Sequence, residues 1–208
     1  AQERLALSFR HMNDDPQNHI RVIPPLLRRE VTLHEPYSGD YIHGYMVNAG
    51  FSENVMKWHR QHPGIPLRFF WDKWEEEPVK RVDNTLSFYQ LDDVEFLRQM
   101  AGCKAYASTA GFESVCEAMY LGKPILMVPA HIEQDCNAYD AEKSGAGIIS
   151  SDFNLQQLLE FAKDYHPNRD FVYWVRGAEY TLLNLLESDS SNYQQVLFNE
   201  MYLVEEFI

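Results

Sequence analysis

A short turn, Thr109-Ala110-Gly111, stands between an apolar segment and the helical pattern FESVCEAMYL. A glycine at this place lets a ligand approach the backbone N–H groups that the first turn of a helix leaves unpaired. Those donors and the positive end of the helix dipole suit a phosphate group. Glu117 lies one turn beyond Ser114 on the same face, where its carboxylate can accept hydrogen bonds from a ribose diol. The spacing therefore predicts a nucleotide site built on one helix.

The same residues also have a purely structural interpretation. Ser114-x-x-Glu117 fits a capping box, and Gly122 followed by Pro124 is an ordinary helix stop. A crossover helix without any ligand would show the same pattern, so both interpretations stay open on these residues alone.

A second group of polar side chains follows the next apolar segment, KPILMVPA. His131, Glu133 and Gln134 stand where the chain enters another helix, and their donors and acceptors suit sugar hydroxyls. Taken singly, each is more simply a solvated loop residue. Together with the preceding turn, they predict one pocket.

The elements that position these groups follow from the alternation of apolar and helical segments. Short apolar runs alternate with amphipathic helices of about ten residues. This predicts an α/β fold, with a Rossmann-like doubly wound parallel sheet of about six strands and helices on both faces. The expected strands lie within residues 40–50, 66–71, 84–91, 103–109, 123–130 and 145–150. In such sheets ligands bind at the carboxyl ends of the strands, which is where both polar groups stand.

The remaining segments lie before and after this series of strands and helices. Residues 1–39 read as one short strand and an extended connector, and we expect them to be the tail of a preceding N-terminal domain. Residues 40–170 form the predicted nucleotide-sugar-binding domain, in which the charged segment 71–81 is expected to be a surface loop. Residues 171–208 are expected to form C-terminal helices near 173–186 and 193–207. The chain begins without Met, and we expect it to be a piece of a longer protein.

The segment from Thr109 to Gly145 resembles the donor-binding region of GT-B glycosyltransferases, especially bacterial members related to the UDP-sugar transferases. Plant enzymes of that superfamily carry His-Cys-Gly-Trp-Asn-Ser-x-x-Glu, a strand, and then Asp/Glu-Gln. This chain has Thr-Ala-Gly-Phe-Glu-Ser-Val-Cys-Glu, then KPILMVP, then Glu-Gln. The resemblance covers the strand–helix series from about Asp40 to Tyr165 and implies the C-terminal half of a GT-B fold.

This resemblance implies a role for each matching residue. It assigns the diphosphate to Thr109, Gly111, Phe112 and Ser114, the ribose to Glu117, and the donor sugar to Glu133 and Gln134, with His131 beside them. It also lets the loop with Asn48 and Gly50 approach the phosphates, and Tyr89 hold the base. Tyr89 has a simpler interpretation as an aromatic residue that packs on the core at the end of its strand.

Two residues depart from the motif. Thr109 replaces a histidine, and Glu113 replaces an asparagine close to the phosphates. A carboxylate in contact with a diphosphate is repelled by about 1 kcal/mol or more even in water. We therefore expect Glu113 to point away or to meet a cation.

The function that the resemblance implies is donor binding in a glycosyltransferase, with a nucleotide-sugar that is UDP-linked. The catalytic base is expected in the missing N-terminal domain, so this chain alone should be inactive, and neither the acceptor nor the base can be assigned. Two other classes stay open: a UDP-sugar 2-epimerase-like isomerase domain, and a non-catalytic domain that binds a partner protein.

Composition excludes several other classes. The formal net charge is −13, and such a surface repels nucleic acids. The three cysteines lack the pairing of a zinc or redox motif and read as reduced thiols. No apolar run is long enough for a membrane span, and the N-terminus does not resemble a signal peptide. We expect a cytoplasmic protein without a metal ion or an organic cofactor.

Overall fold

The computed structural model describes residues 4–73 and 77–187. The chain divides into two units: the larger is Leu27–Val172, and the described residues of the smaller are 4–26 and 173–187. The expected helix at residues 193–207 lies outside the described residues. The expected division of the chain at residues 39 and 170 stays a prediction.

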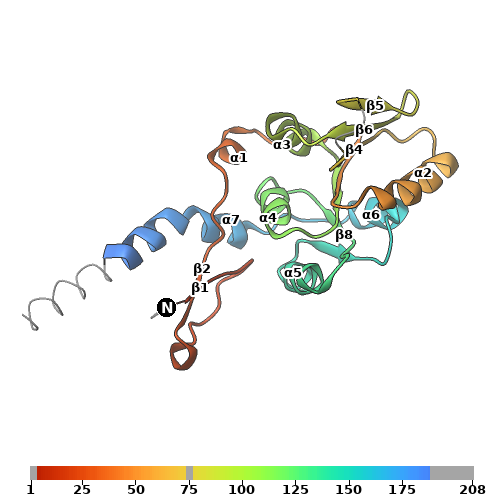
Figure 1. Cartoon of the computed structure of the whole chain (residues 1–208). Helices are drawn as coiled ribbons and strands as arrows, with labels where there is room; N and C mark the ends of the chain where they lie inside the picture. Colours follow the sequence, from red (N-terminus) through yellow and green to blue (C-terminus); the bar gives the residue numbers. More distant parts are fainter. Residues whose placement is uncertain (1–3, 74–76, 188–208) are drawn as a thin grey trace, which may run out of the picture. The chain divides into compact units, whose positions relative to one another are not determined.

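The larger unit is built on a seven-stranded sheet in the order β5-β6-β4-β3-β7-β8-β9 (Figure 1). Its strands are β3 (Ile42–Met46), β4 (Leu67–Trp71), β5 (Val79–Arg81), β6 (Leu86–Gln90), β7 (Ala105–Ser108), β8 (Ile125–Met127) and β9 (Gly147–Ile149). The neighbouring strands from β6 to β9 all pair in parallel. They are the six predicted strands, and the α/β doubly wound fold is confirmed.

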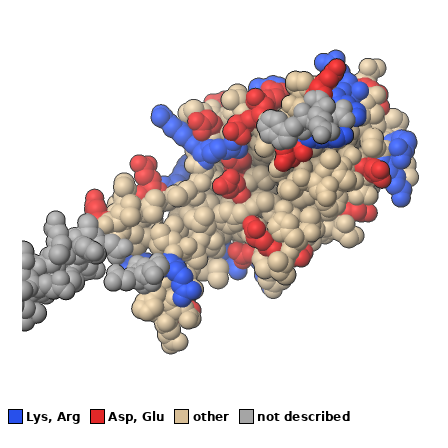
Figure 2. Space-filling view, viewed as in Figure 1, with Lys and Arg blue, Asp and Glu red and all other residues tan. Residues whose placement is uncertain are grey.

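One strand was not predicted. β5 pairs antiparallel with β6 at the edge of the sheet, in the segment expected to be a surface loop. All three residues of β5 are exposed. The strand forms through backbone pairing, and the sequence holds no apolar pattern that would predict it. Lys and Arg side chains gather over this edge, with Asp and Glu side chains beside them (Figure 2).

Helices cover both faces of the sheet, because alternate residues of the inner strands are apolar on each side. The helices are α2 (Ser52–Gln61), α3 (Asp93–Gly102), α4 (Phe112–Tyr120), α5 (Ile132–Lys143) and α6 (Leu155–Phe161). Trp58 of α2 and Leu158 of α6 join one core cluster with Met46 and Phe69. On the other face, Phe96 of α3 packs edge-on against the ring of His43, with ring centroids 4.8 Å apart.

The point where the direction of winding reverses lies between β3 and β7. The chain leaves β3 toward β4 on one side and leaves β7 toward β8 on the other, so the loops after these neighbouring strands diverge. The backbone N–H of Val47 donates to Thr109 Oγ1 across this point, at 3.4 Å. A crevice of this kind is where doubly wound sheets bind their ligands.

The segment before β3 is fastened to the larger unit by its backbone. It contains α1 (Arg29–Leu33). The N–H of Tyr37 donates to the carbonyl of Ala101 and that of Gly39 to the carbonyl of Gly102, each at 3.0 Å. These bonds lie close in sequence to Arg28, which reaches the site described below.

The smaller unit contains two strands where one was expected. β1 (Arg4–Leu7) and β2 (Ile20–Ile23) pair in parallel, joined by a turn with the 3-10 helix η1 (Pro16–Asn18). The helix α7 (Arg169–Arg176) and the helical residues 178–187 correspond to the predicted helix near 173–186. Within this unit, the indole N–H of Trp174 donates to the carbonyl of Ser8 at 3.0 Å.

Candidate functional site

The turn that leads from β7 into α4 has an unusual backbone. Ala110 adopts φ +61°, in the left-handed region that favours glycine, and it is fully buried. A non-glycine residue there costs about 1 kcal/mol or more, and such residues cluster at functional sites. Two hydrogen bonds hold the turn: the Ala110 N–H donates to Ser108 Oγ at 3.0 Å, and Asn137 of α5 donates to the Ala110 carbonyl at 3.4 Å.

Gly111 is the N-cap residue of α4, and no side chain caps this helix. Ser114 lies inside the first turn, where its hydroxyl donates to the Gly111 carbonyl at 3.2 Å. The capping-box interpretation of Ser114 is therefore wrong. The expected helix stop is confirmed, because Gly122 follows the C-cap residue with φ +67°.

The N-terminus of α4 is open to a ligand at Gly111. A Cβ atom built on Gly111 would meet only Ser114 Oγ, at 3.7 Å. Gly111 has φ −63°, so the glycine is not needed for the turn itself. What its missing side chain provides is space next to the first N–H groups of the helix.

Glu117 does not stand free in this site. Its carboxylate accepts two hydrogen bonds from Arg28, at 2.6 Å from Nε and 2.9 Å from Nη2. The Glu117 side chain is 3% exposed and that of Arg28 37%, and Arg28 Nη1 also lies 3.3 Å from Asp93. Burial raises the pKa of Glu117 and Arg28 counteracts this rise, while hydrogen bonding to Glu117 raises the pKa of Arg28. We interpret the contact as a charged, bidentate ion pair.

These groups surround a pocket of about 630 Å³. It is lined by Arg28, Tyr45, Leu91, Asp93, Phe96, Gly111, Phe112, Glu113, Ser114, Glu117 and Glu133. Among these described residues there are four carboxylates and one guanidinium. The pocket offers backbone donors at one helix end, together with four carboxylates, of which Glu117 and Asp93 contact the single cation Arg28.

The structure brings five of the predicted site residues together in this lining. They are Gly111, Phe112, Ser114, Glu117 and Glu133. Glu113 also lines the pocket and is exposed. Of the two expected placements, pointing away or meeting a cation, the structure is nearer to the second, because besides the hydrogen bonding to Glu117 the charge of Glu113 helps to raise the pKa of Arg28. Glu113 follows directly after the first residue of α4, where the helix dipole favours a negative charge.

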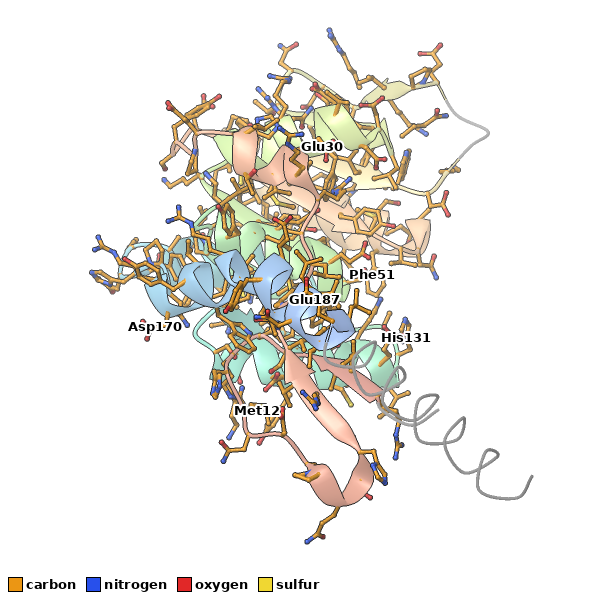
Figure 3. All side chains as sticks on the ribbon, turned by 90° about the vertical axis from the view of Figure 1, so that its left-hand side faces the viewer. Met12, Glu30, Phe51, His131, Asp170 and Glu187 are labelled. Carbon is orange, nitrogen blue, oxygen red and sulfur yellow. The ribbon has the colours of Figure 1, made fainter. Side chains whose placement is uncertain are left out.

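Three further predicted residues lie close in sequence to the lining but are differently placed. Thr109 is fully buried and accepts a hydrogen bond from Val47. Gln134 is buried, and its side-chain oxygen accepts from the N–H of Ala130 at 2.8 Å. His131 is exposed at the N-cap of α5, which it does not cap with its side chain (Figure 3).

The remaining three do not reach the pocket. The Asn48 side chain accepts from the N–H of Gly50 at 2.8 Å, and both residues are exposed in the loop after β3. Tyr89 stacks on Phe70 with ring centroids 5.0 Å apart. This placement agrees with the simpler interpretation of Tyr89 as an aromatic residue that packs on the core.

Arg28 and Asp93 are the charged pocket residues that sequence reasoning missed, beside the unpredicted Tyr45, Leu91 and Phe96. Arg28 stands in a connector beside Arg29, and nothing local distinguishes the two. Asp93 follows Asp92, whose side chain caps α3 by accepting from the N–H of Glu95 at 2.8 Å. Both residues reach the pocket only through contacts that are distant in sequence.

Other sites of chemistry are few among the described residues. No group of three His, Cys, Asp or Glu side chains within residues 4–73 and 77–187 is arranged to hold a metal ion. The three cysteines are free, with Cys103 and Cys116 buried and Cys136 exposed. None of the helices in the described ranges is both long and apolar enough to cross a membrane.

Comparison with known proteins identifies the family. Residues 2–165 match the model of glycosyl transferase family 1, and the chain belongs to this family. It is 26% identical over 105 residues to ugt-48 of Caenorhabditis elegans, which is named provisionally as a UDP-glucuronosyltransferase. That match covers 50% of this chain and 20% of the nematode protein.

Solved structures share the fold. The glycosyltransferase of kitacinnamycin matches with a TM-score of 0.59 at 14% identity, over 84% of this chain and 50% of that protein. CalG4, the calicheamicin glycosyltransferase, matches with a TM-score of 0.57 at 13% identity, over 82% of this chain and 48% of that protein. The chain thus spans about half the length of these two proteins, and it has the fold of one part of a GT-B glycosyltransferase.

Proposed function

We propose that this chain is the donor-binding domain of a glycosyltransferase and that its donor is a UDP-linked sugar. Family membership supports sugar transfer and favours it over the isomerase alternative. The observation that carries the proposal is the open N-terminus of α4 at Gly111, beside a pocket at the point where the winding of the sheet reverses.

In this proposal the diphosphate rests at the start of α4. The N–H groups of the first turn and the helix dipole face the phosphates, and the same donors stabilise the nucleotide diphosphate as it departs. Glu133 at the opposite side of the pocket accepts hydrogen bonds from the sugar. The reaction would therefore be assisted by fixed dipoles at the leaving group.

Arg28 orients the ribose-binding carboxylate and adds positive charge. Each oxygen of Glu117 accepts one hydrogen bond from Arg28, and a carboxylate oxygen has room for a second. A ribose diol can thus bind Glu117 while Arg28 holds it. The same guanidinium offsets part of the repulsion between the acidic lining and the diphosphate.

In this proposal the chain meets one of two requirements of sugar transfer, the stabilisation of the departing nucleotide diphosphate. An acceptor hydroxyl must also be aligned and deprotonated, and the family resemblance places that base in the other half of the enzyme. We therefore expect the chain to bind the donor without transferring the sugar.

Calorimetry with UDP and the 208-residue chain tests the proposal. We expect saturable binding, and we expect Gly111→Ala to weaken it about tenfold because the new methyl group occupies the approach to the helix. Gly64→Ala is the matched control, since a Cβ at Gly64 meets nothing within 4 Å. The absence of UDP binding at millimolar concentration would refute the proposal and favour the non-catalytic, partner-binding alternative that the acidic lining allows.

A substitution of Glu113 should change UDP affinity and protein stability in opposite directions. Glu113→Gln removes a negative charge next to the phosphates, so UDP should bind more tightly, while the lost interaction with the helix dipole should reduce stability by about 0.3 to 1 kcal/mol. Calorimetry and urea unfolding measure the two effects. Weaker UDP binding in Glu113→Gln would show that Glu113 contributes to the site rather than opposing it.

A further inference from the structure

A second polar pocket lies near the N-terminal ends of β4 and β6, and it shares no lining residue with the pocket proposed to bind the donor. It has a volume of about 370 Å³, and its lining includes Pro66, Leu67, Asn84 and Thr85, which precede or begin β4 and β6. The donor pocket lies where parallel strands end, and this one lies where they begin. The two sites are therefore separate.

Three arginines from three elements line this second pocket: Arg68 of β4, Arg81 of β5 and Arg98 of α3. The chain as a whole carries 31 acidic and 18 basic residues. A pocket with three arginines is therefore unusual for a chain with an excess of acidic residues. Figure 2 shows Lys and Arg side chains at this edge of the sheet.

Two of the arginines belong to one row across the sheet. Arg68 is the register partner of Ser87 on β6, and Ser87 is the register partner of Arg81 on β5. Register partners point to the same face, and neighbouring strands lie about 4.8 Å apart. The two arginines therefore leave the backbone on either side of Ser87 and on one face of the sheet, and their side chains are long enough to approach the same anion.

Two of the three arginines are held in place, and the three are not neutralised as a set. The guanidinium of Arg68 lies 3.8 Å from the ring centroid of Tyr41, and Arg98 is fixed by two hydrogen bonds to Glu95, at 2.7 and 2.5 Å. In the part of the chain that the structure describes, neither Arg68 nor Arg81 forms an ion pair. Because the side chains of Arg68 and Arg98 are already ordered, they lose less conformational entropy when a ligand binds.

The carboxylates of the pocket are already engaged. Glu95 is paired with Arg98 and also accepts from Gln99 at 2.6 Å. Asp83 contacts the ring of His59 at 2.7 Å and accepts from the N–H groups of Thr85 and Leu86, each at 2.8 Å. Both carboxylates therefore already have partners, although the charge of Arg68 also acts on Glu95 and, after the hydrogen bonds from Arg98, helps to lower its pKa.

We propose that this pocket binds a phosphate group carried by a small soluble molecule. Two arginines that leave the backbone on either side of Ser87 match a tetrahedral dianion, to which arginine can donate in bidentate fashion. The volume exceeds that of a bare ion, and Tyr89 in the lining offers an aromatic surface for the organic part. The inference does not depend on the proposed sugar transfer.

The test uses nitrogen-15 NMR of the full chain, titrated with inorganic phosphate and with methyl phosphate against sodium chloride of equal ionic strength. We expect saturable shifts of the backbone amides of Arg68, Arg81 and Ser87. Arg68→Gln and Arg81→Gln should each weaken binding about tenfold, the effect of losing a charged hydrogen-bonding group. Arg60→Gln, an exposed arginine of α2 outside the pocket, is the control and should leave binding unchanged.

Three results would overturn the proposal: shifts that do not saturate, equal shifts with chloride, or equal affinity in the variants and the control. Sedimentation with phosphatidic acid vesicles separates a soluble ligand from a lipid headgroup, and vesicle binding without methyl phosphate binding would also contradict it. A shift of the Gly111 amide reports phosphate that binds at the proposed donor site. The experiment therefore tests this proposal and the proposed function separately.

Discussion

At the scale of single residues, the contact between Arg28 and Glu117 changes the expected role of the carboxylate. Glu117 was expected to accept hydrogen bonds from a ribose, and the structure shows that it also accepts two hydrogen bonds from the guanidinium of Arg28. A buried carboxylate without a partner would be costly, because its desolvation would go uncompensated. The pair therefore compensates the burial of the Glu117 carboxylate and fixes its position, and in the proposed function it also orients this carboxylate toward the ribose.

Arg28→Gln separates these two roles. It should lower the free energy of unfolding by about 1 to 3 kcal/mol, because Glu117 loses its charged partner, and Glu117→Gln in the same chain should restore part of the loss. Urea unfolding measures the effect, with Arg29→Gln as the exposed control. A loss of equal size in Arg29→Gln would rule out a specific role for the pair.

The same variants predict a change in ligand preference. The wild-type chain should prefer UDP over 2′-deoxy-UDP, because Glu117 accepts from the ribose hydroxyls, and Glu117→Gln should bind UDP more weakly by about 1 to 3 kcal/mol. Calorimetry with both nucleotides decides this. An unchanged preference would remove Glu117 from the ribose contact.

At the scale of elements, the turn between β5 and β6 depends on one carboxylate. Asp83 accepts hydrogen bonds from the backbone of Thr85 and Leu86 and contacts the ring of His59. These bonds hold the pKa of Asp83 well below its usual range, with the contact to His59 as the largest cause. The turn places β5, and β5 places Arg81 in the second pocket.

A lowered pKa makes the stability of this turn dependent on pH. The ionised form is favoured in the folded state, so the contribution of Asp83 is complete above its unfolded pKa of about 3.9 and is lost as the pH falls through the lower folded value. Asp83→Asn should therefore be less stable than the wild type at neutral pH, and the difference should shrink below about pH 4. Urea unfolding over a pH series measures it; a difference that stays constant with pH would contradict this account.

Element prediction succeeded where periodicity was strong and failed where it was absent. All six parallel strands carry apolar runs that the sequence shows, and the helices between them follow from their apolar faces. β5 has only exposed residues, and β2 became a strand through pairing with β1. A strand that forms through backbone pairing, without a buried face, leaves no apolar pattern to read.

At the scale of the whole molecule, the acidic surface should act on a charged ligand before it binds. The net charge is −13, and the four carboxylates of the donor pocket have the same sign as a diphosphate. Salt screens such repulsion, with a Debye length of about 8 Å near 0.15 M. The association rate of UDP should therefore rise with sodium chloride, whereas a basic site would show a fall.

Stopped-flow fluorescence with a labelled UDP measures this dependence, and Glu113→Gln should reduce its slope. Slower association at higher salt would mean that Arg28 and the end of α4 dominate the field at the entrance of the pocket.

The sequence by itself determined the six parallel strands, the class of sheet that they form and the turn at Gly111, because apolar periodicity and a glycine before a helix are local properties. The order of the strands in the sheet came from the structure. The sequence also determined which half of a glycosyltransferase the chain resembles, since the motif from Thr109 to Gln134 is contiguous. Only the tertiary structure decided that Arg28 meets Glu117, that Tyr89 packs away from the donor pocket, and that Arg68 and Arg81 share one row. These are contacts between segments far apart in the chain, and their geometry is set by strand register and helix packing rather than by neighbouring residues.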